Sequence, residues 1–206
     1  MKSIMRAAMR RFLLRFWSDQ KASQIVEFAA TLPLLMLFVV GIFDFSGAFA
    51  LKQKLANAAR EGARAAAAGP ANDLGGYSTA VPASVGDAFQ VVDNYLVNAR
   101  VSDCGLSGST GAPSGTLMWV YTASGCPAGT LTLTINRGYY FPQNSTTPAT
   151  NSCAVQPVNG QIALVATCVS IQYPYAWRFS KVASLLGSTS GPPGTFSTTA
   201  VVLNEN

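Results

Sequence analysis

The sequence predicts an α+β protein in which a long N-terminal helix, membrane-spanning in its first half, precedes a short second helix packed on a small antiparallel β-sheet. Three observations predict this class. Apolar residues are concentrated between Ile25 and Leu51, at a density that globular cores rarely show. Helix-forming residues continue from there to Ala68. Beyond Arg100, short segments of β-branched and aromatic residues are separated by Gly- and Ser-rich turns, which is typical of strands.

Residues 1–22 form a basic segment that we interpret as a cytoplasmic leader. They hold six Lys or Arg residues against Asp19 alone, which accounts for the whole net charge of +5, because the later residues carry eight of each sign. Basic residues mark the cytoplasmic side of a membrane helix, so we expect the N-terminus inside and the C-terminus outside. The neutral remainder offers no basic patch for phosphates, and we expect no nucleic-acid partner.

Residues 23–68 are predicted to form one long helix, with a transmembrane portion at about 25–47. The stretch Leu34–Val40 has no polar residue, and at about 1.5 Å per residue the apolar run is long enough to cross a core of about 30 Å. Gly69 and Pro70 are a typical termination signal. Four small residues in the second half would let another backbone come close, or simply favour a helix: Ala59, Gly62, Ala63 and Ala66.

Residues 69–206 are predicted to form an external α+β domain. Ser84 and Asp87 resemble a capping box ahead of an amphipathic pattern that continues to Ala99, which predicts the second helix. A helical turn is predicted at Lys181–Gly187. A sheet must bury one face, and the two helices are the available cover. Strands are predicted at Leu117–Tyr121, Leu131–Asn136, Gln161–Tyr173 and Phe196–Leu203, and in the second of these Leu131, Leu133 and Ile135 alternate with threonines.

Four cysteines lie beyond the apolar run and none lies before it. An even number on one side of a membrane segment predicts an oxidising compartment and two disulfides. Of the three possible pairings we favour Cys104 with Cys126 and Cys153 with Cys168, because each closes a local loop, worth about 3 kcal/mol in the loop-entropy model. Four buried free thiols are the alternative. Without histidine a metal would need all four sulfurs, whose spacing does not resemble a zinc site, so no metal is expected.

Two carboxylates, Glu27 and Asp44, lie near the ends of the apolar run, where a charged group usually has a partner or a function. An ionised Glu27 in hydrocarbon costs about 2.5–3.5 kcal/mol. A cut between Ala22 and Ser23 would create an α-amine four residues before Glu27, on the same helical face. Asp44, at the outer end, either anchors the helix at the interface or pairs with a Lys or Arg of a neighbouring subunit.

These residues resemble a known family. A small residue, four further residues and then Glu27-Phe28 opening an apolar helix is similar to the prepilin peptidase site of type IV-like pilins, although Ala22 stands where those pilins usually have Gly. The wider stretch, with its VEFA opening, PLL and AAREGAR ending, closely resembles the TadE-like proteins of tight-adherence (Flp) pili. The resemblance covers about residues 22–67. The segment Gly69–Gly160 resembles nothing that we can place.

The resemblance implies a pilin-like helix and a structural subunit, a minor pilin or pseudopilin, in the assembly of Tad/Flp pili that serve adherence and surface attachment. It implies a single membrane crossing and, as partners, a prepilin peptidase, other pilins and the Tad assembly proteins. The implied location is the bacterial inner membrane with the C-terminal domain in the periplasm, or outside the cell as part of a pilus.

The same residues bear on three other functions. A secreted or anchored periplasmic protein would use Ala48-Phe49-Ala50 as a cleavage site. An enzyme is not expected, because the chain has no histidine and its only S-x-x-K, ending at Lys21, lies in the leader; no cofactor is expected either. An adhesion module would expose aromatic residues that otherwise pack in strands: Tyr139, Tyr140, Phe141, Tyr173, Tyr175 and Trp177.

Overall fold

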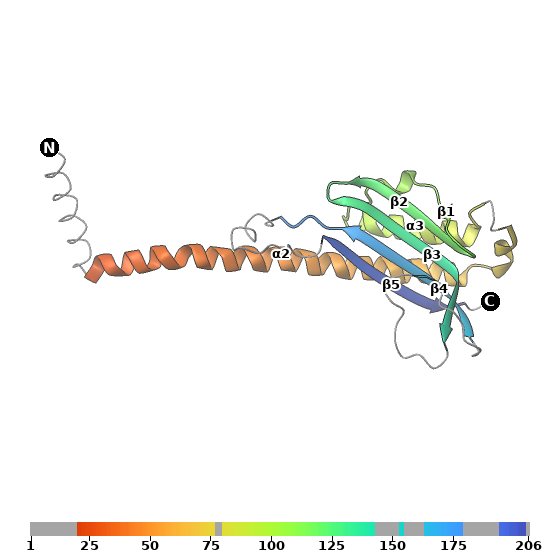
Figure 1. Cartoon of the computed structure of the whole chain (residues 1–206), viewed down its shortest axis with the longest axis horizontal. Helices are drawn as coiled ribbons and strands as arrows, with labels where there is room; N and C mark the ends of the chain where they lie inside the picture. The colour runs from red at the N-terminus through yellow and green to blue at the C-terminus, as the bar shows by residue number, and fades with distance from the viewer. Residues whose placement is uncertain (1–19, 77–79, 143–152, 155–162, 179–193, 205–206) are drawn as a thin grey trace.

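The structure, a computed structural model, describes residues 20–76, 80–142, 153–154, 163–178 and 194–204. Two helices and a five-stranded antiparallel sheet confirm the predicted α+β class (Figure 1). The helices are α2 (Gln20–Ala68), the 3-10 helix η1 (Ala71–Gly76), α3 (Ala83–Asn98) and the 3-10 turn η2 (Leu106–Gly108). The strands are β1 (Ala112–Pro113), β2 (Met118–Cys126), β3 (Gly129–Pro142), β4 (Ala163–Pro174) and β5 (Thr195–Leu203).

Helix α2 runs the length of the molecule as one helix of 49 residues (Figure 1). At about 1.5 Å per residue it is about 74 Å long. Its second half is rich in alanine, the best helix former, and the predicted end at Ala68 is confirmed. The Gly69 N–H donates to the Ala66 carbonyl (3.1 Å) as the helix ends. The described part of α2 already begins at Gln20, whereas residues 1–19 of the predicted leader lie outside the described residues.

The sheet has the order β1-β2-β3-β4-β5, and each strand is antiparallel to its neighbours. The four predicted strands correspond to β2, β3, β4 and β5. The missed strand is β1, which has only two residues and lies in a Gly-rich stretch that we read as a loop. The predicted turn at Lys181–Gly187 lies outside the described residues.

One face of the sheet packs on α2 and α3, so the domain has two layers (Figure 1). Strand β3 alternates as predicted: Leu131, Leu133 and Ile135 are fully buried, and the threonines between them are partly exposed. Leu55 of α2 and Leu96 of α3 join them in one core. Burying each such side chain contributes about 1.5–3 kcal/mol, so this core holds the domain on the second half of α2.

The N-terminus of α3 differs from the predicted capping box. The helix begins at Ala83, and no side chain of the preceding Pro82 caps it. The Asp73 carboxylate of η1 instead accepts a hydrogen bond from the Ser84 backbone N–H (2.8 Å). A carboxylate is favourable at this positive helix end. The prediction from Ser84 and Asp87 was wrong because the capping group comes from an earlier segment, which no local pattern reveals.

A buried arginine joins β3 to the C-terminal end of α2. The guanidinium of Arg137, whose residue is 1% exposed, donates to the carbonyl of Ala66 and to the carbonyl of Gly69, the latter at 3.1 Å. A cation is favourable at this negative helix end. Burial lowers the pKa of the Arg137 guanidinium, and the nearby Asp73 carboxylate raises it. Arg137 and Asp73, which we call the C-terminal clamp, therefore hold α2, α3 and β3 together.

Both disulfides lie after α3, in the half of the chain that holds the sheet, with the pairing that the local-loop argument favours. Cys104 pairs with Cys126, which ties the segment after α3 to the end of β2. Cys153 pairs with Cys168 of β4. No free cysteine is left among these four described residues, so the alternative of four free thiols is wrong.

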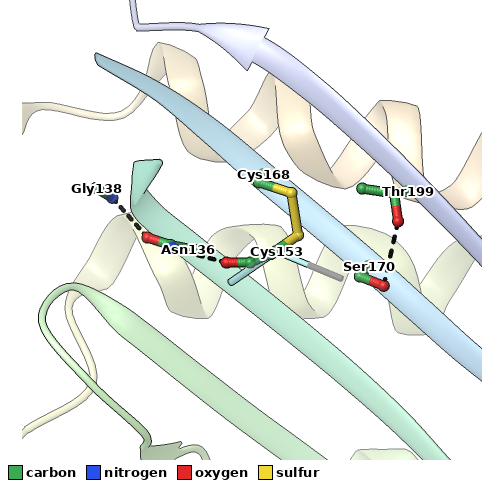
Figure 2. The surroundings of a disulfide bond; sticks show 6 residues. All are labelled: Asn136, Gly138, Cys153, Cys168, Ser170 and Thr199. Atoms are coloured by element: carbon green, nitrogen blue, oxygen red, sulfur yellow. Dashed lines mark hydrogen bonds between the residues drawn. A yellow bond between two sulfur atoms is a disulfide. The ribbon is translucent and has the colours of Figure 1, made fainter. Parts of the chain in front are cut away.

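Figure 2 shows Asn136 of β3 beside the Cys153–Cys168 disulfide. The side-chain amide donates to the Cys153 carbonyl (2.8 Å) and its oxygen accepts from the Gly138 N–H (2.9 Å). The register of β3 shifts between Asn136 and Tyr139, and such a bulge leaves backbone groups unpaired. The fully buried Asn136 satisfies the Gly138 N–H inside this bulge and the Cys153 carbonyl outside it, which explains a polar side chain at this depth.

The four small residues in the second half of α2 all lie in the domain core. Ala59, Ala63 and Ala66 are fully buried, and Gly62 is buried as well. A Cβ added to Gly62 would lie 2.5 Å from a methyl group of Val92. The backbone that comes close at this point is therefore that of α3 in the same chain, and not a helix of a neighbouring subunit.

Replacing Gly62 with alanine is expected to lower the free energy of unfolding by about 1 kcal/mol. Overpacking against the buried Val92 costs about 1–3 kcal/mol, more than the gain of about 1 kcal/mol in helix propensity. Gly86→Ala in α3 is the matched control, because nothing lies within 4 Å of its added Cβ, and it should raise stability slightly. Urea unfolding of the detergent-solubilised full-length protein measures both. If both variants changed the free energy of unfolding in the same direction, the close contact at Gly62 would be contradicted.

Candidate membrane and assembly site

The first half of α2 carries a continuous apolar surface that no described part of the chain covers over most of its length. We call residues 24–50 the apolar half. Phe28 and Leu35 are each 65% exposed, and Phe43 is 71% exposed. Figure 1 shows most of this part of α2 extending beyond the domain. Its other exposed large side chains are Ile25, Val26, Leu32, Leu34, Met36, Phe38, Val39, Ile42, Phe45 and Phe49.

The apolar half has the dimensions of a membrane span. Among the described residues, one helix is long and apolar enough to cross a membrane, and its most apolar window has no buried residue. The predicted span at 25–47 is about 33 Å long, close to the hydrocarbon thickness of about 30 Å. An exposed apolar surface of this extent requires lipid or other apolar helices as cover.

The predicted processing residues lie at the start of the apolar half. Ala22 and Ser23 belong to α2, and their side chains lie outside the described residues. Glu27 and Phe28 are both exposed. Because residues four apart share a helical face, a positive group at Ser23 would lie within reach of the Glu27 carboxylate. The geometry therefore permits the charge pair that the spacing predicts.

Asp44 lies at the opposite end of the apolar half and is only 7% exposed. Its Oδ1 accepts a hydrogen bond from the Arg178 backbone N–H (3.4 Å), and its carboxylate also bonds the Tyr175 hydroxyl. Burial raises the pKa of Tyr175, the Asp44 charge raises it further, and Arg178 lowers it. Asp44 thus holds the segment after β4 against α2, so these partners lie in the same chain.

Four aromatic side chains surround the Asp44 contact. Phe45 of α2 lies edge to face with Trp177, with ring centroids 5.4 Å apart. Tyr175 lies 5.1 Å from Trp177 and 5.1 Å from Phe196. Aromatic rings with a polar atom favour the boundary between lipid and water. This aromatic cluster is therefore suited to the boundary between lipid and water, and it lies close to the predicted end of the span near residue 47.

The aromatic residues considered for an adhesion surface do not gather on one face. Tyr139 is buried beside the Cys153–Cys168 disulfide, and Tyr173 is buried in the main core. Tyr140 is 39% exposed, whereas the Phe141 side chain lies outside the described residues. Tyr175 and Trp177 belong to the aromatic cluster on α2. Sequence reasoning missed this cluster because its members come from three distant segments, and its one signal was the density of aromatic residues after β4.

The groups that this site brings together are apolar side chains, aromatic rings and two carboxylates. Within the described ranges, no three His, Cys, Asp or Glu side chains come together to hold a metal ion. All four cysteines are used in disulfides. The apolar half provides exposed apolar surface, with the Glu27 carboxylate near its start and the aromatic cluster at its end.

Comparison with known proteins bears on this same helix. Residues 22–64 match the family model described as TadE-like protein. No curated protein and no solved structure matches the chain. The match covers the apolar half and Glu27 and ends in the buried half of α2, so α3 and the sheet lie outside it. It confirms the resemblance to the TadE-like family and, with the exposed apolar helix, indicates a pilin-like subunit anchored in a membrane.

Proposed function

We propose that this chain, whose long helix matches the TadE-like family, is a minor pilin or pseudopilin-type subunit of a tight-adherence pilus, with a structural role and no catalytic one. The observation that carries the proposal is the exposed apolar half of α2, continuous with a helix that is buried in a folded domain. A filament subunit needs both parts, because the apolar rod packs among other helices while the domain remains in water.

The apolar half suits both a membrane and the interior of a filament. Lipid tails are as apolar as leucine, so neighbouring helices can replace lipid at little cost. Glu27 favours the filament over the membrane. The free-energy cost of its carboxylate in an apolar environment falls when an amine of a neighbouring subunit lies beside it. Other pilins and the Tad assembly proteins are the proposed partners in this exchange, and adherence is then a property of the assembled filament.

The proposed orientation places the N-terminus in the cytoplasm and the domain in the periplasm. The basic leader favours the cytoplasmic side. The two disulfides favour an oxidising compartment for the domain. Both arguments agree on a single crossing of the inner membrane, after which the domain is carried outside the cell if the subunit enters a pilus.

The alternative, a secreted protein cut after Ala50, has less support. Helix α2 continues through this position without interruption. Asp44 and Ala48, both buried, would be removed by the cut. The edge-to-face contact of Phe45 with Trp177 would be lost as well. A chain cut there would expose the apolar surface that these residues now cover.

The proposal is tested by the intact mass and N-terminal sequence of the protein from membranes and from sheared surface material. A start at Ser23 is expected, together with recovery from sheared filaments. Ala22→Leu should leave the chain uncut, because the resemblance implies a small residue before the cut. Ala50→Leu is the matched control and should change nothing, since Ala50 is exposed. A start at Leu51 that Ala50→Leu abolishes would overturn the proposal, and an uncut Met1 in the wild type would overturn the processing step.

A further inference from the structure

We propose that a groove between the span and the external domain binds an anionic glycerophospholipid from the outer leaflet of the membrane. The groove has a volume of about 750 Å³ and is lined by α2, the segment after α3, the turn between β2 and β3 and the segment after β4. The inference rests on the membrane insertion in the proposed function, and it adds a ligand that neither the family match nor the filament role requires.

The groove passes from the hydrocarbon region to water along α2. Val40 and Phe43 line its inner end, and Leu51 and Lys54 line its outer end. At about 1.5 Å per residue, the distance along the helix from Val40 to Lys54 is about 21 Å. The inner end therefore lies within the span, and the outer end lies beyond the aromatic cluster at the membrane boundary.

The outer part of the groove is positively charged. Three cations line the groove, Lys54 and Arg100 towards its outer end and Arg178 at the level of Asp44, whose carboxylate is the single negative charge in the lining. The Lys54 ammonium donates to the Ala99 carbonyl at the end of α3 (2.8 Å), which holds it in the wall and leaves two of its three N–H groups for other acceptors. Asp44 already accepts from the Arg178 backbone N–H. An excess of two positive charges therefore faces the groove.

This concentration of charge is unusual for the chain. Only eight Lys and Arg residues follow the leader, balanced by eight Asp and Glu residues, yet three of the eight cations line this groove. Lys and Arg are the side chains that recognise phosphate. A free phosphate would leave the apolar end unfilled, whereas a phospholipid places an acyl chain on Val40 and Phe43 and its phosphate among the cations.

The test uses the purified full-length protein in nanodiscs of equal parts phosphatidylglycerol and phosphatidylcholine. After extraction into mild detergent, native mass spectrometry counts the lipids that remain on each chain. Phosphatidylglycerol should be retained at least about tenfold over phosphatidylcholine, since each cation near an anionic headgroup contributes a factor of about five. Arg100→Gln alone should reduce this ratio about fivefold, and Lys54→Gln/Arg100→Gln/Arg178→Gln should bring it near one.

The control is Lys52→Gln/Arg60→Gln/Arg64→Gln, which removes the same charge from exposed positions of α2 outside the groove and should keep the wild-type ratio. Equal retention of both lipids by the wild type would overturn the site. A fall of the phosphatidylglycerol to phosphatidylcholine ratio in the control as large as that in the groove variant would also overturn it. If inorganic phosphate binds while phosphatidylglycerol is not enriched, the lipid is the wrong ligand. The assay needs only a membrane-inserted chain, so its failure leaves the pilus proposal standing, and a failure to enter filaments leaves the lipid site standing.

Discussion

Replacing Arg137 with methionine is expected to lower the free energy of unfolding of the external domain by about 3 kcal/mol. The guanidinium donates to the carbonyls of Ala66 and Gly69 at the end of α2, and hydrogen bonds from charged donors contribute about 1.5–3 kcal/mol each. Methionine keeps much of the apolar stem but leaves the Gly69 carbonyl without this donor. The midpoint of urea unfolding, followed by pulse proteolysis of the detergent-solubilised full-length protein, measures the loss.

Two further variants separate the clamp from a general effect of charge. Arg60→Met removes an exposed arginine of α2 and should change stability by less than about 0.5 kcal/mol. The free energy of unfolding of the Arg137→Lys variant should lie between those of Arg137→Met and the wild type, because one ammonium cannot reproduce the planar guanidinium that reaches both carbonyls. An Arg137→Met protein as stable as Arg60→Met would show that the C-terminal clamp contributes nothing.

Replacing Glu27 with alanine is expected to reduce the amount of protein in sheared filaments about 100-fold relative to its amount in the membrane. When the amine comes from a neighbouring subunit, the Glu27 carboxylate costs about 2.5–3.5 kcal/mol in lipid and loses this cost in the filament. The alanine variant has neither the cost nor the partner. A difference of this size corresponds to about a factor of 100 in an equilibrium constant. Quantitative immunoblots of membrane and sheared fractions measure the ratio.

The control for Glu27 is Glu61→Ala, the same change on the same helix. Glu61 is exposed and pairs with Arg64 at 3.2 Å, a surface ion pair of little worth, so less than a twofold change is expected. Glu27→Gln keeps the shape without the charge and should behave as Glu27→Ala does. If Glu27→Gln enters filaments as well as the wild type, the charge pair is not what selects the filament over lipid.

The long helix and its apolar half were readable from the sequence because each depends on neighbours along the chain. Helix propensity accumulates over the alanine-rich segment and ends where Gly69 and Pro70 interrupt it. The apolar run predicts a membrane span, because its length matches the thickness of the hydrocarbon core. The strand around Leu133 followed from alternation alone, and the disulfides from the short loops that they close. Glu27 stood out for the same local reason, a charge at the start of an apolar run.

The contacts that hold the domain on α2 were decided only by the tertiary structure. Nothing near Arg137 in the sequence indicates that it binds the end of α2, and nothing near Asp73 indicates that it caps α3. The partners of Asp44 lie in the segment after β4, and Gly62 faces α3 of its own chain. Such pairs have no periodicity, because which residues meet depends on how the sheet folds back over the helix. Local propensity thus determined the elements and the membrane span, whereas the burial of distant groups against one another determined their partners.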